Sequence, residues 1–322
     1  MTTPYQAAHQ GLALIDRSHW GRIRVAGDDR MRFLHNQTTQ AFEPLQPGQS
    51  CETVFVTATA RTIDLVTAYV EAEAVLLLTS PGLAARLLEW MDRYIFFADK
   101  VTLEDISDRT FTFTLIGPQA AAALSNLGLS DLPEPGQHSK AQLADATVNV
   151  AAGTGLALPG YTLMGPKPQA NAIWSALADA AILSATDWEQ LRLEQGRPLP
   201  GHELTEEDNP LEAGLWHAIS FEKGCYIGQE TIARLNTYQG VKKQLWGLQL
   251  SASAAAGDSI TYEGEKVGRL TSIVERPAGT IGLGYIRTKA GGAGLSVQVG
   301  EASATVVEVP YLSRGYLTSA DR

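Results

Sequence analysis

The sequence has few cysteines, no long apolar run and no excess of positive charge. Its two cysteines, Cys51 and Cys225, form no CxxC pair, so a disulfide framework is excluded and a reducing compartment is expected. Two thiolates alone are also too few ligands for a complete iron–sulfur cluster. No resident metal site is therefore predicted.

The longest apolar run, residues 74–78 (AVLLL), is far too short to cross a bilayer, which takes about 20 residues. Residues 1–10 lack the basic and then apolar pattern of a secretory signal. The formal net charge is −10, whereas binding to nucleic acid or a membrane surface rewards clustered Lys and Arg. We therefore expect a cytoplasmic protein with no direct nucleic-acid or membrane partner.

A chain of 322 residues is long enough for two or three domains. Up to residue 240, alternating strands are interspersed with amphipathic helices, which predicts an α+β fold. From residue 245 to 313, short alternating segments follow one another between turns, which predicts an antiparallel barrel or sandwich. We place one domain at 1–240, with two intertwined subdomains and a loop near 131–140, and a C-terminal β-barrel domain at 241–322.

Two tryptophans occupy distinctive positions. Trp20 directly precedes an alternating strand at 21–26, and Trp188 lies in residues 186–189 (TDWE), which fit a capping box and predict the start of a helix. On that helix Trp188 and Arg192 are four residues apart and share a face. From the residues alone, each tryptophan is more readily a core residue than a ligand contact, because large aromatics dominate protein cores.

Residues 223–230 (KGCYIGQE) place Cys225 two positions after Lys223 and between two glycines. Glycine permits tight turns and close approach of a ligand. If the two side chains turn the same way, the ammonium favours the thiolate, which is a nucleophile and a soft metal ligand. The alternative is a buried, inert cysteine. A thiol hydrolase would also need a histidine, and spacing does not bring His202 or His217 to the thiol.

The same eight residues resemble the motif of YgfZ proteins, which are folate-binding relatives of the glycine-cleavage aminomethyltransferase and serve iron–sulfur protein maintenance. Further blocks resemble those that both groups share: 20–27 (WGRIRVAG), 33–39 (FLHNQTT), 191–196 (LRLEQG), 201–204 (GHEL) and 209–214 (NPLEAG). The first motif is specific to YgfZ proteins, and the others identify the wider superfamily. The resemblance covers most of the chain and implies an aminomethyltransferase-like folate-binding fold with a C-terminal antiparallel β-barrel.

This resemblance implies roles for individual residues. In YgfZ proteins two tryptophans are associated with folate binding, and they match Trp20 and Trp188. A flat pterin or aminobenzoyl ring gains from stacking on an indole. Arg192 is a candidate for the glutamate tail of folate, because a guanidinium suits carboxylates. Asp64 falls where the aminomethyltransferase has two adjacent aspartates, one acting on the folate nitrogen, but Ile63 occupies the first position.

Residues 153–161 (GTGLALPGY) depart from the acidic turn that holds the pterin in the aminomethyltransferase. A pterin's amino edge needs an acceptor, so the loss of the carboxylate predicts a different or weaker folate pose. The expected function is thus a tetrahydrofolate-binding accessory protein for assembly or repair of iron–sulfur proteins, with an indirect effect on tRNA modification, rather than a classical enzyme.

In this interpretation the expected partners are iron–sulfur cluster carriers or client proteins, and Cys225 is a transient cluster ligand shared with them. The candidate catalytic residues are Cys225, Lys223 and Asp64. Two alternatives stay open. One is a tetrahydrofolate-dependent aminomethyl or one-carbon transferase, and the other is a scaffold protein that has lost its ligand.

Overall fold

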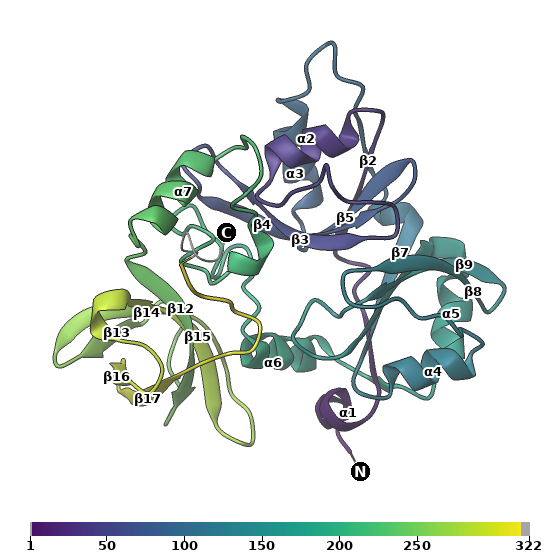
Figure 1. The fold of residues 1–322 in the computed structure, drawn as a ribbon. Helices are drawn as coiled ribbons and strands as arrows, with labels where there is room; N and C mark the ends of the chain where they lie inside the picture. The colour runs from purple at the N-terminus through teal and green to yellow at the C-terminus, as the bar shows by residue number, and fades with distance from the viewer. Residues whose placement is uncertain (1, 317–322) are drawn as a thin grey trace. The chain divides into compact units, whose positions relative to one another are not determined.

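The computed structural model describes residues 2–316 (Figure 1). The chain forms two compact units, Met1–Thr53 with Val66–Trp188 and Val54–Leu65 with Glu189–Arg322. Strands β3 (Ser50–Val56) and β4 (Thr62–Val70) continue from the first unit into the second. The predicted domain boundary near residue 240 stays a prediction.

The first unit contains a six-stranded sheet in the order β11-β1-β7-β10-β9-β8. Helices α4 and α5 cover one of its faces (Figure 1), where Leu124 and Ile173 are fully buried against Phe111 and Leu115. An N-terminal helix precedes the sheet. The bounds are α1 Pro4–Gln10, β1 Ala13–Asp16, β7 Thr110–Ile116, α4 Ala120–Asn126, β8 His138–Leu143, β9 Ala146–Ala152, β10 Gly160–Pro166, α5 Ala170–Ala176 and β11 Ala181–Ile182.

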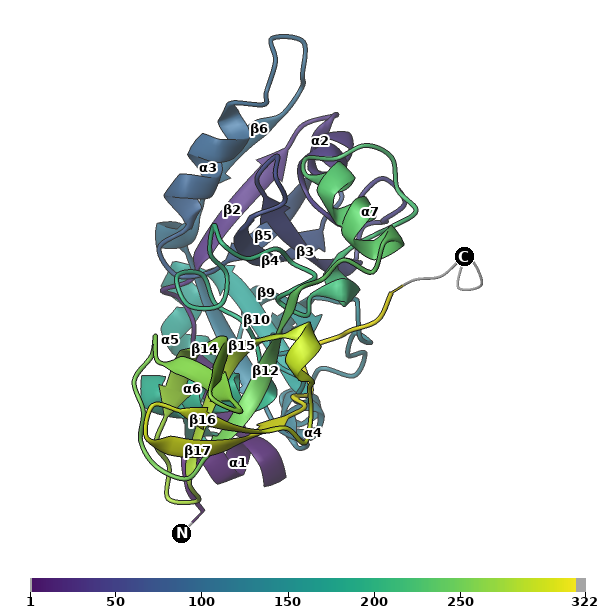
Figure 2. The ribbon, with the colours of Figure 1, turned by 90° about the vertical axis from the view of Figure 1, so that its left-hand side faces the viewer.

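A second sheet has the order β3-β4-β5-β2-β6, with β2 at Gly21–Ala26, β5 at Ala74–Thr79 and β6 at Thr102–Asp105. Helix α2 (Arg30–Gln37) contacts β5, and α3 (Ala84–Asp92) runs beside β2 and β6 (Figure 2). In the first unit, Tyr69 and Leu78 of this sheet pack against Ala151 and Met164 of the six-stranded sheet. The first unit is therefore layered as helices, sheet, sheet and helices, with an apolar seam between the sheets.

The second unit contains a closed barrel of antiparallel strands in the order β12-β15-β14-β13-β16-β17, which confirms the predicted C-terminal barrel and the α+β fold. Glu263 and Gly264 have φ of +50° and +83°, as the tight hairpin between β13 and β14 requires. The strands are β12 Lys243–Leu250, β13 Ser259–Tyr262, β14 Glu265–Val274, β15 Thr280–Arg287, β16 Ser296–Val299 and β17 Ala302–Val307.

Beside the barrel, the second unit holds α7 (Gln229–Thr237) and the hairpin that joins β3 to β4. Gly228 precedes α7 with φ of +83°, and a Cβ there would lie 2.9 Å from the Thr57 carbonyl oxygen. Only glycine fits this close approach. Short 3₁₀ helices complete the chain at Ser107–Arg109, Lys167–Gln169, Trp216–Ala218 and Thr288–Ala290. Within residues 2–316, no helix is long and apolar enough to cross a membrane.

Helix α6 (Ala185–Gln195) begins slightly earlier than its sequence suggests. The predicted capping box at 186–189 is wrong, because Ser184 and Asp187 form the reciprocal pair instead. The Asp187 amide donates to Ser184 Oγ at 3.1 Å, and the Ser184 amide donates to Asp187 Oδ2 at 2.9 Å. Glu189 is drawn into a bidentate pair with Arg192, which supplies two charge-assisted hydrogen bonds.

Candidate functional site

The structure brings the two predicted tryptophans together in the first unit. Trp20 lies in the link from β1 to β2, where its amide donates to the Arg17 carbonyl at 2.9 Å. Trp188 lies in the first turns of α6. Their rings meet edge to face with centroids 6.0 Å apart and planes at 88°. Trp20 is only 2% exposed, whereas Trp188 is half-buried, so Trp188 is the one of the pair that offers surface to a ligand.

Arg17 contacts both tryptophans, and no motif in the sequence marks this residue. Its guanidinium carbon lies 3.7 Å from the Trp20 ring centroid and 4.8 Å from that of Trp188, which is cation–π geometry. The side chain is 1% exposed, and Nη1 donates to the Thr154 carbonyl at 2.8 Å. A buried cation therefore contacts the turn 153–161, in which the sequence has no carboxylate.

Arg192 is the centre of a buried polar network in the second unit. It is 1% exposed, and all five N–H donors are engaged. The acceptors are both Glu189 carboxylate oxygens at 2.8 and 2.7 Å, Glu203 Oε2 at 2.9 Å, the Arg197 carbonyl at 2.8 Å and Ser272 Oγ at 3.0 Å. Burial lowers the pKa of Arg192, but the two carboxylates outweigh it, so the pKa is raised and the guanidinium stays charged.

This network limits how Arg192 can meet a ligand. Glu203 has no exposed surface, whereas the Glu189 side chain is 36% exposed. A ligand carboxylate would therefore replace Glu189 rather than Glu203, because Glu189 regains water when it leaves. The predicted role of Arg192 in folate binding stays a prediction.

Asp64 lies on β4 in the second unit and has no exposed surface. The neighbouring Thr62 hydroxyl donates to the carbonyls of Thr205 and Asp208 at 3.0 and 3.3 Å, which ties this strand to the segment after α6. A buried carboxylate on a fixed strand is well held for a specific contact. Its predicted role toward folate stays a prediction.

Cys225 lies in the loop before α7, and its side chain is exposed. Lys223 is 9% exposed, and its Nζ lies 4.5 Å from the centroid of the Tyr226 ring. Burial raises the pKa of Tyr226 well above its ordinary value, so the ring stays a neutral phenol for this cation–π contact. The Cys225 thiol is therefore exposed enough to react. The Lys223 ammonium packs against the face of the Tyr226 ring.

The two histidines considered as partners for the thiol form other contacts. His217 Nδ1 lies 2.9 Å from Ser313 Oγ, and His202 Nδ1 lies 3.4 Å from Ser272 Oγ. The thiol-hydrolase alternative gains no support from these bonds. Across residues 2–316, no three His, Cys, Asp or Glu side chains are placed to hold a metal ion.

Three comparisons with known proteins agree with this fold. The family model of the GCVT N-terminal domain matches residues 2–223. A provisionally named chloroplastic transferase of Arabidopsis thaliana is 48% identical over 98% of this chain and 74% of its own length. An aminomethyltransferase of Picosynechococcus is 28% identical over 92% of this chain and 84% of its own.

Among solved structures, the glycine cleavage system aminomethyltransferase T from Bartonella henselae matches with a TM-score of 0.84. The match covers 98% of this chain and 90% of that one at 22% identity, which shows the shared fold. The chain therefore belongs to the GCVT family, the superfamily of the tetrahydrofolate-binding aminomethyltransferase T-proteins.

Proposed function

We propose that this protein binds tetrahydrofolate or a derivative and assists the assembly or repair of iron–sulfur proteins, with an indirect effect on tRNA modification. The main support for the proposal is the contact between Arg17 and the turn 153–161. In a fold of the aminomethyltransferase type, the turn 153–161 has no carboxylate, and a buried guanidinium binds its Thr154 carbonyl instead. Such a site suits folate retention in an altered pose better than aminomethyl transfer.

The residues near Arg17 fit one edge of a pterin. Arg17 is buried and bonded to Thr154, so it acts on a ligand through its charge, which favours the electron-rich oxo edge over the amino edge. Trp188 offers its half-buried indole for stacking, while Trp20 is covered and acts by holding Arg17 and Trp188 in place. Bound tetrahydrofolate supplies the two nitrogens that carry one-carbon units.

Cys225 supplies the second part of the proposal. Its exposed thiol is accessible to a protein partner, and the acidic chain, with a net charge of −10, suits a protein rather than a nucleic acid. One thiol cannot hold a cluster alone. Cys225 therefore shares a transient cluster with a carrier or client protein in the cytoplasm, and the cluster is cargo rather than a resident cofactor.

Calorimetric titration of tetrahydrofolate tests the folate part. Trp188→Ala is expected to weaken binding about tenfold, because it removes the exposed stacking surface. Trp90→Ala on α3 is the matched control, and it should bind like the parent protein. Unchanged affinity in Trp188→Ala would refute the tryptophan assignment, and absence of binding by the parent protein would refute the proposal.

Activity of iron–sulfur enzymes in cells tests the thiol part. Cells that carry Cys225→Ser should lose client activity, whereas Cys51→Ser, at the half-buried second cysteine, should retain it. The protein level of both variants is measured by immunoblot. Full client activity with Cys225→Ser present at the parent level would refute the role of the thiol.

The alternative is a tetrahydrofolate-dependent aminomethyl or one-carbon transferase. It is favoured by the 28% identity to an aminomethyltransferase and by the buried carboxylate of Asp64 on β4. The purified protein is incubated with tetrahydrofolate and an aminomethylated carrier protein, and methylene-tetrahydrofolate is measured. Turnover that is lost in Asp64→Asn would favour the transferase over the accessory role.

A further inference from the structure

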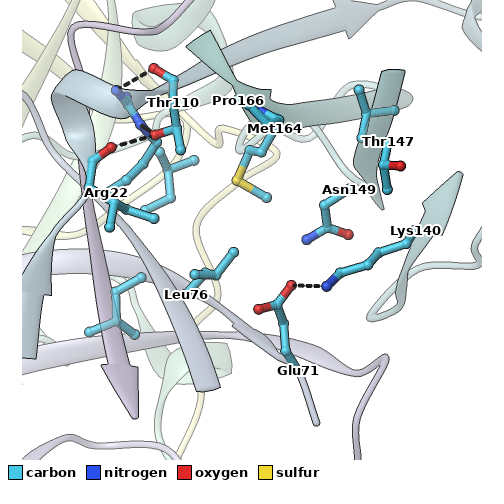
Figure 3. Close-up of a pocket in the computed structure, with 14 residues that line it drawn as sticks. Arg22, Glu71, Leu76, Thr110, Lys140, Thr147, Asn149, Met164 and Pro166 are labelled. Carbon is cyan, nitrogen blue, oxygen red and sulfur yellow. Dashed lines mark hydrogen bonds and ion pairs between the residues drawn. The ribbon is translucent and has the colours of Figure 1, made fainter. Parts of the chain in front are cut away.

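A cavity of about 300 Å³ lies within the first unit, between the two sheets (Figure 3). Leu76 and Leu78 of β5 form one wall, and Met164 of β10 faces them. None of Arg17, Trp20 and Trp188 lines it. Two sheets bound the cavity and most of its lining side chains are apolar, so its shape and surface suit a flat ring system.

Asn149 on β9 places a carboxamide toward this space (Figure 3). The residue is 6% exposed, and its side chain is bonded to His138 through one atom, 2.9 Å from Nδ1. Within residues 2–316, the other carboxamide atom, placed as Nδ2, has no hydrogen-bond partner. A buried amide group left without a partner is unfavourable, so a ligand that pairs with it is favoured.

The identity of this atom follows from the state of His138. His138 Nε2 lies 2.9 Å from the Val70 carbonyl oxygen, which only accepts, so Nε2 carries a hydrogen. A neutral imidazole then accepts at Nδ1, and Asn149 must turn its NH₂ to it and its oxygen to the cavity. In an imidazolium both nitrogens donate, and the NH₂ faces the cavity. A partner group with both a donor and an acceptor satisfies either arrangement.

The charged side chains that line the cavity already have hydrogen-bond or ion-pair partners. The Arg22 guanidinium gives all five donors to Thr110, Ser107, Ser18 and Trp20. At the cavity's rim, Lys140 Nζ pairs with Glu71 Oε1 at 3.3 Å (Figure 3). A charged ligand would find no free hydrogen-bond donor on Arg22 and would lose its hydration. The cavity therefore favours an uncharged molecule.

We propose that this cavity binds a small, flat, uncharged ring compound with a cyclic amide, whose adjacent N–H and C=O meet the Asn149 carboxamide. The rings lie between Leu76 and Met164, and the amide edge points to β9. Neither tryptophan lines this cavity, although its walls Leu76, Leu78 and Met164 pack in one apolar cluster with both. The proposal does not rest on folate binding.

Isoquinolin-1(2H)-one is the probe, followed by ligand-observed NMR titration of the whole protein. It should bind the parent protein, and the N-methyl derivative, which lacks the donor, should bind about tenfold more weakly. Asn149→Leu should also weaken the probe about tenfold, and Leu76→Trp, which fills the cavity, should abolish binding. Asn126→Leu, the same change at an exposed position on α4, should have no effect.

Several outcomes would overturn the proposal. They are no binding by the parent protein, equal binding by Leu76→Trp, equal binding by Asn149→Leu, or displacement of the probe by tetrahydrofolate. Leu76→Trp decides the matter if Asn149→Leu does not fold, because it leaves the bond between Asn149 and His138 intact.

Discussion

Removing the Glu203 carboxylate should destabilise the protein strongly. Glu203 Oε2 accepts from Arg192 Nη1 at 2.9 Å and from the Leu199 amide at 3.1 Å, and Oε1 accepts from the hydroxyls of Thr271 and Ser272 at 2.7 and 2.6 Å. Glu203→Ala leaves a buried guanidinium without one of its two carboxylates. Breaking such a pair costs about 3–5 kcal/mol, and we expect a loss of that size in the free energy of unfolding.

Urea denaturation followed by circular dichroism measures this loss. Glu203→Gln keeps the shape and half of the acceptors, so it should cost less than Glu203→Ala. Ser272→Ala removes one hydroxyl from the same network and should cost about 1 kcal/mol. A loss below about 1 kcal/mol for Glu203→Ala would refute the reasoning, because it would mean that Arg192 is satisfied without this carboxylate.

Three further predictions concern other parts of the chain. Burial raises the pKa of Glu212, so the stability that its protonated form contributes is present at acid pH and is lost as pH rises through the folded-state pKa. In urea titrations, Glu212→Gln should therefore raise the free energy of unfolding by roughly 1 kcal/mol at pH 8 and leave it unchanged at pH 4. Gly196 has φ of +85°, and a Cβ would lie 2.3 Å from Val309 Cγ2, so Gly196→Ala should cost about 2–5 kcal/mol in the same assay. Gly201→Ala, with φ of +80° and open space, should cost only about 1 kcal/mol, and equal losses would contradict the steric argument. A thiol reagent should modify Cys225 first because it is exposed, and faster labelling of the other cysteine would contradict that placement.

The barrel was predictable because its signals are local. Alternation along each strand and the Glu263-Gly264 turn need only neighbouring residues to be recognised. The observed strands β13 (Ser259–Tyr262), β14 (Glu265–Val274) and β16 (Ser296–Val299) lie within the predicted range of residues 245–313. The pairing of Trp20 with Trp188 was suggested by the resemblance, since 168 positions of chain separate them and no spacing rule connects them.

The unpredicted features depend on contacts between distant segments. Arg17 is an ordinary cation in the sequence, and only folding sets it over Trp20 and against Thr154. The capping box was misplaced because Glu189 fits the motif equally well, but its carboxylate is held by the Arg192 guanidinium. Local propensity cannot rank a helix cap against a tertiary ion pair.

The segment Val54–Leu65 forms a compact unit with residues after 188, which are synthesised much later. Val54 and Leu65 have no exposed surface in the folded chain, where they pack with Leu204 and Leu215. At about 5–20 residues per second, these partners emerge roughly 7–30 s after the segment itself. During that interval the apolar side chains of this hairpin are exposed on the nascent chain. A chaperone that binds them until residue 215 has been synthesised would protect the protein from aggregation.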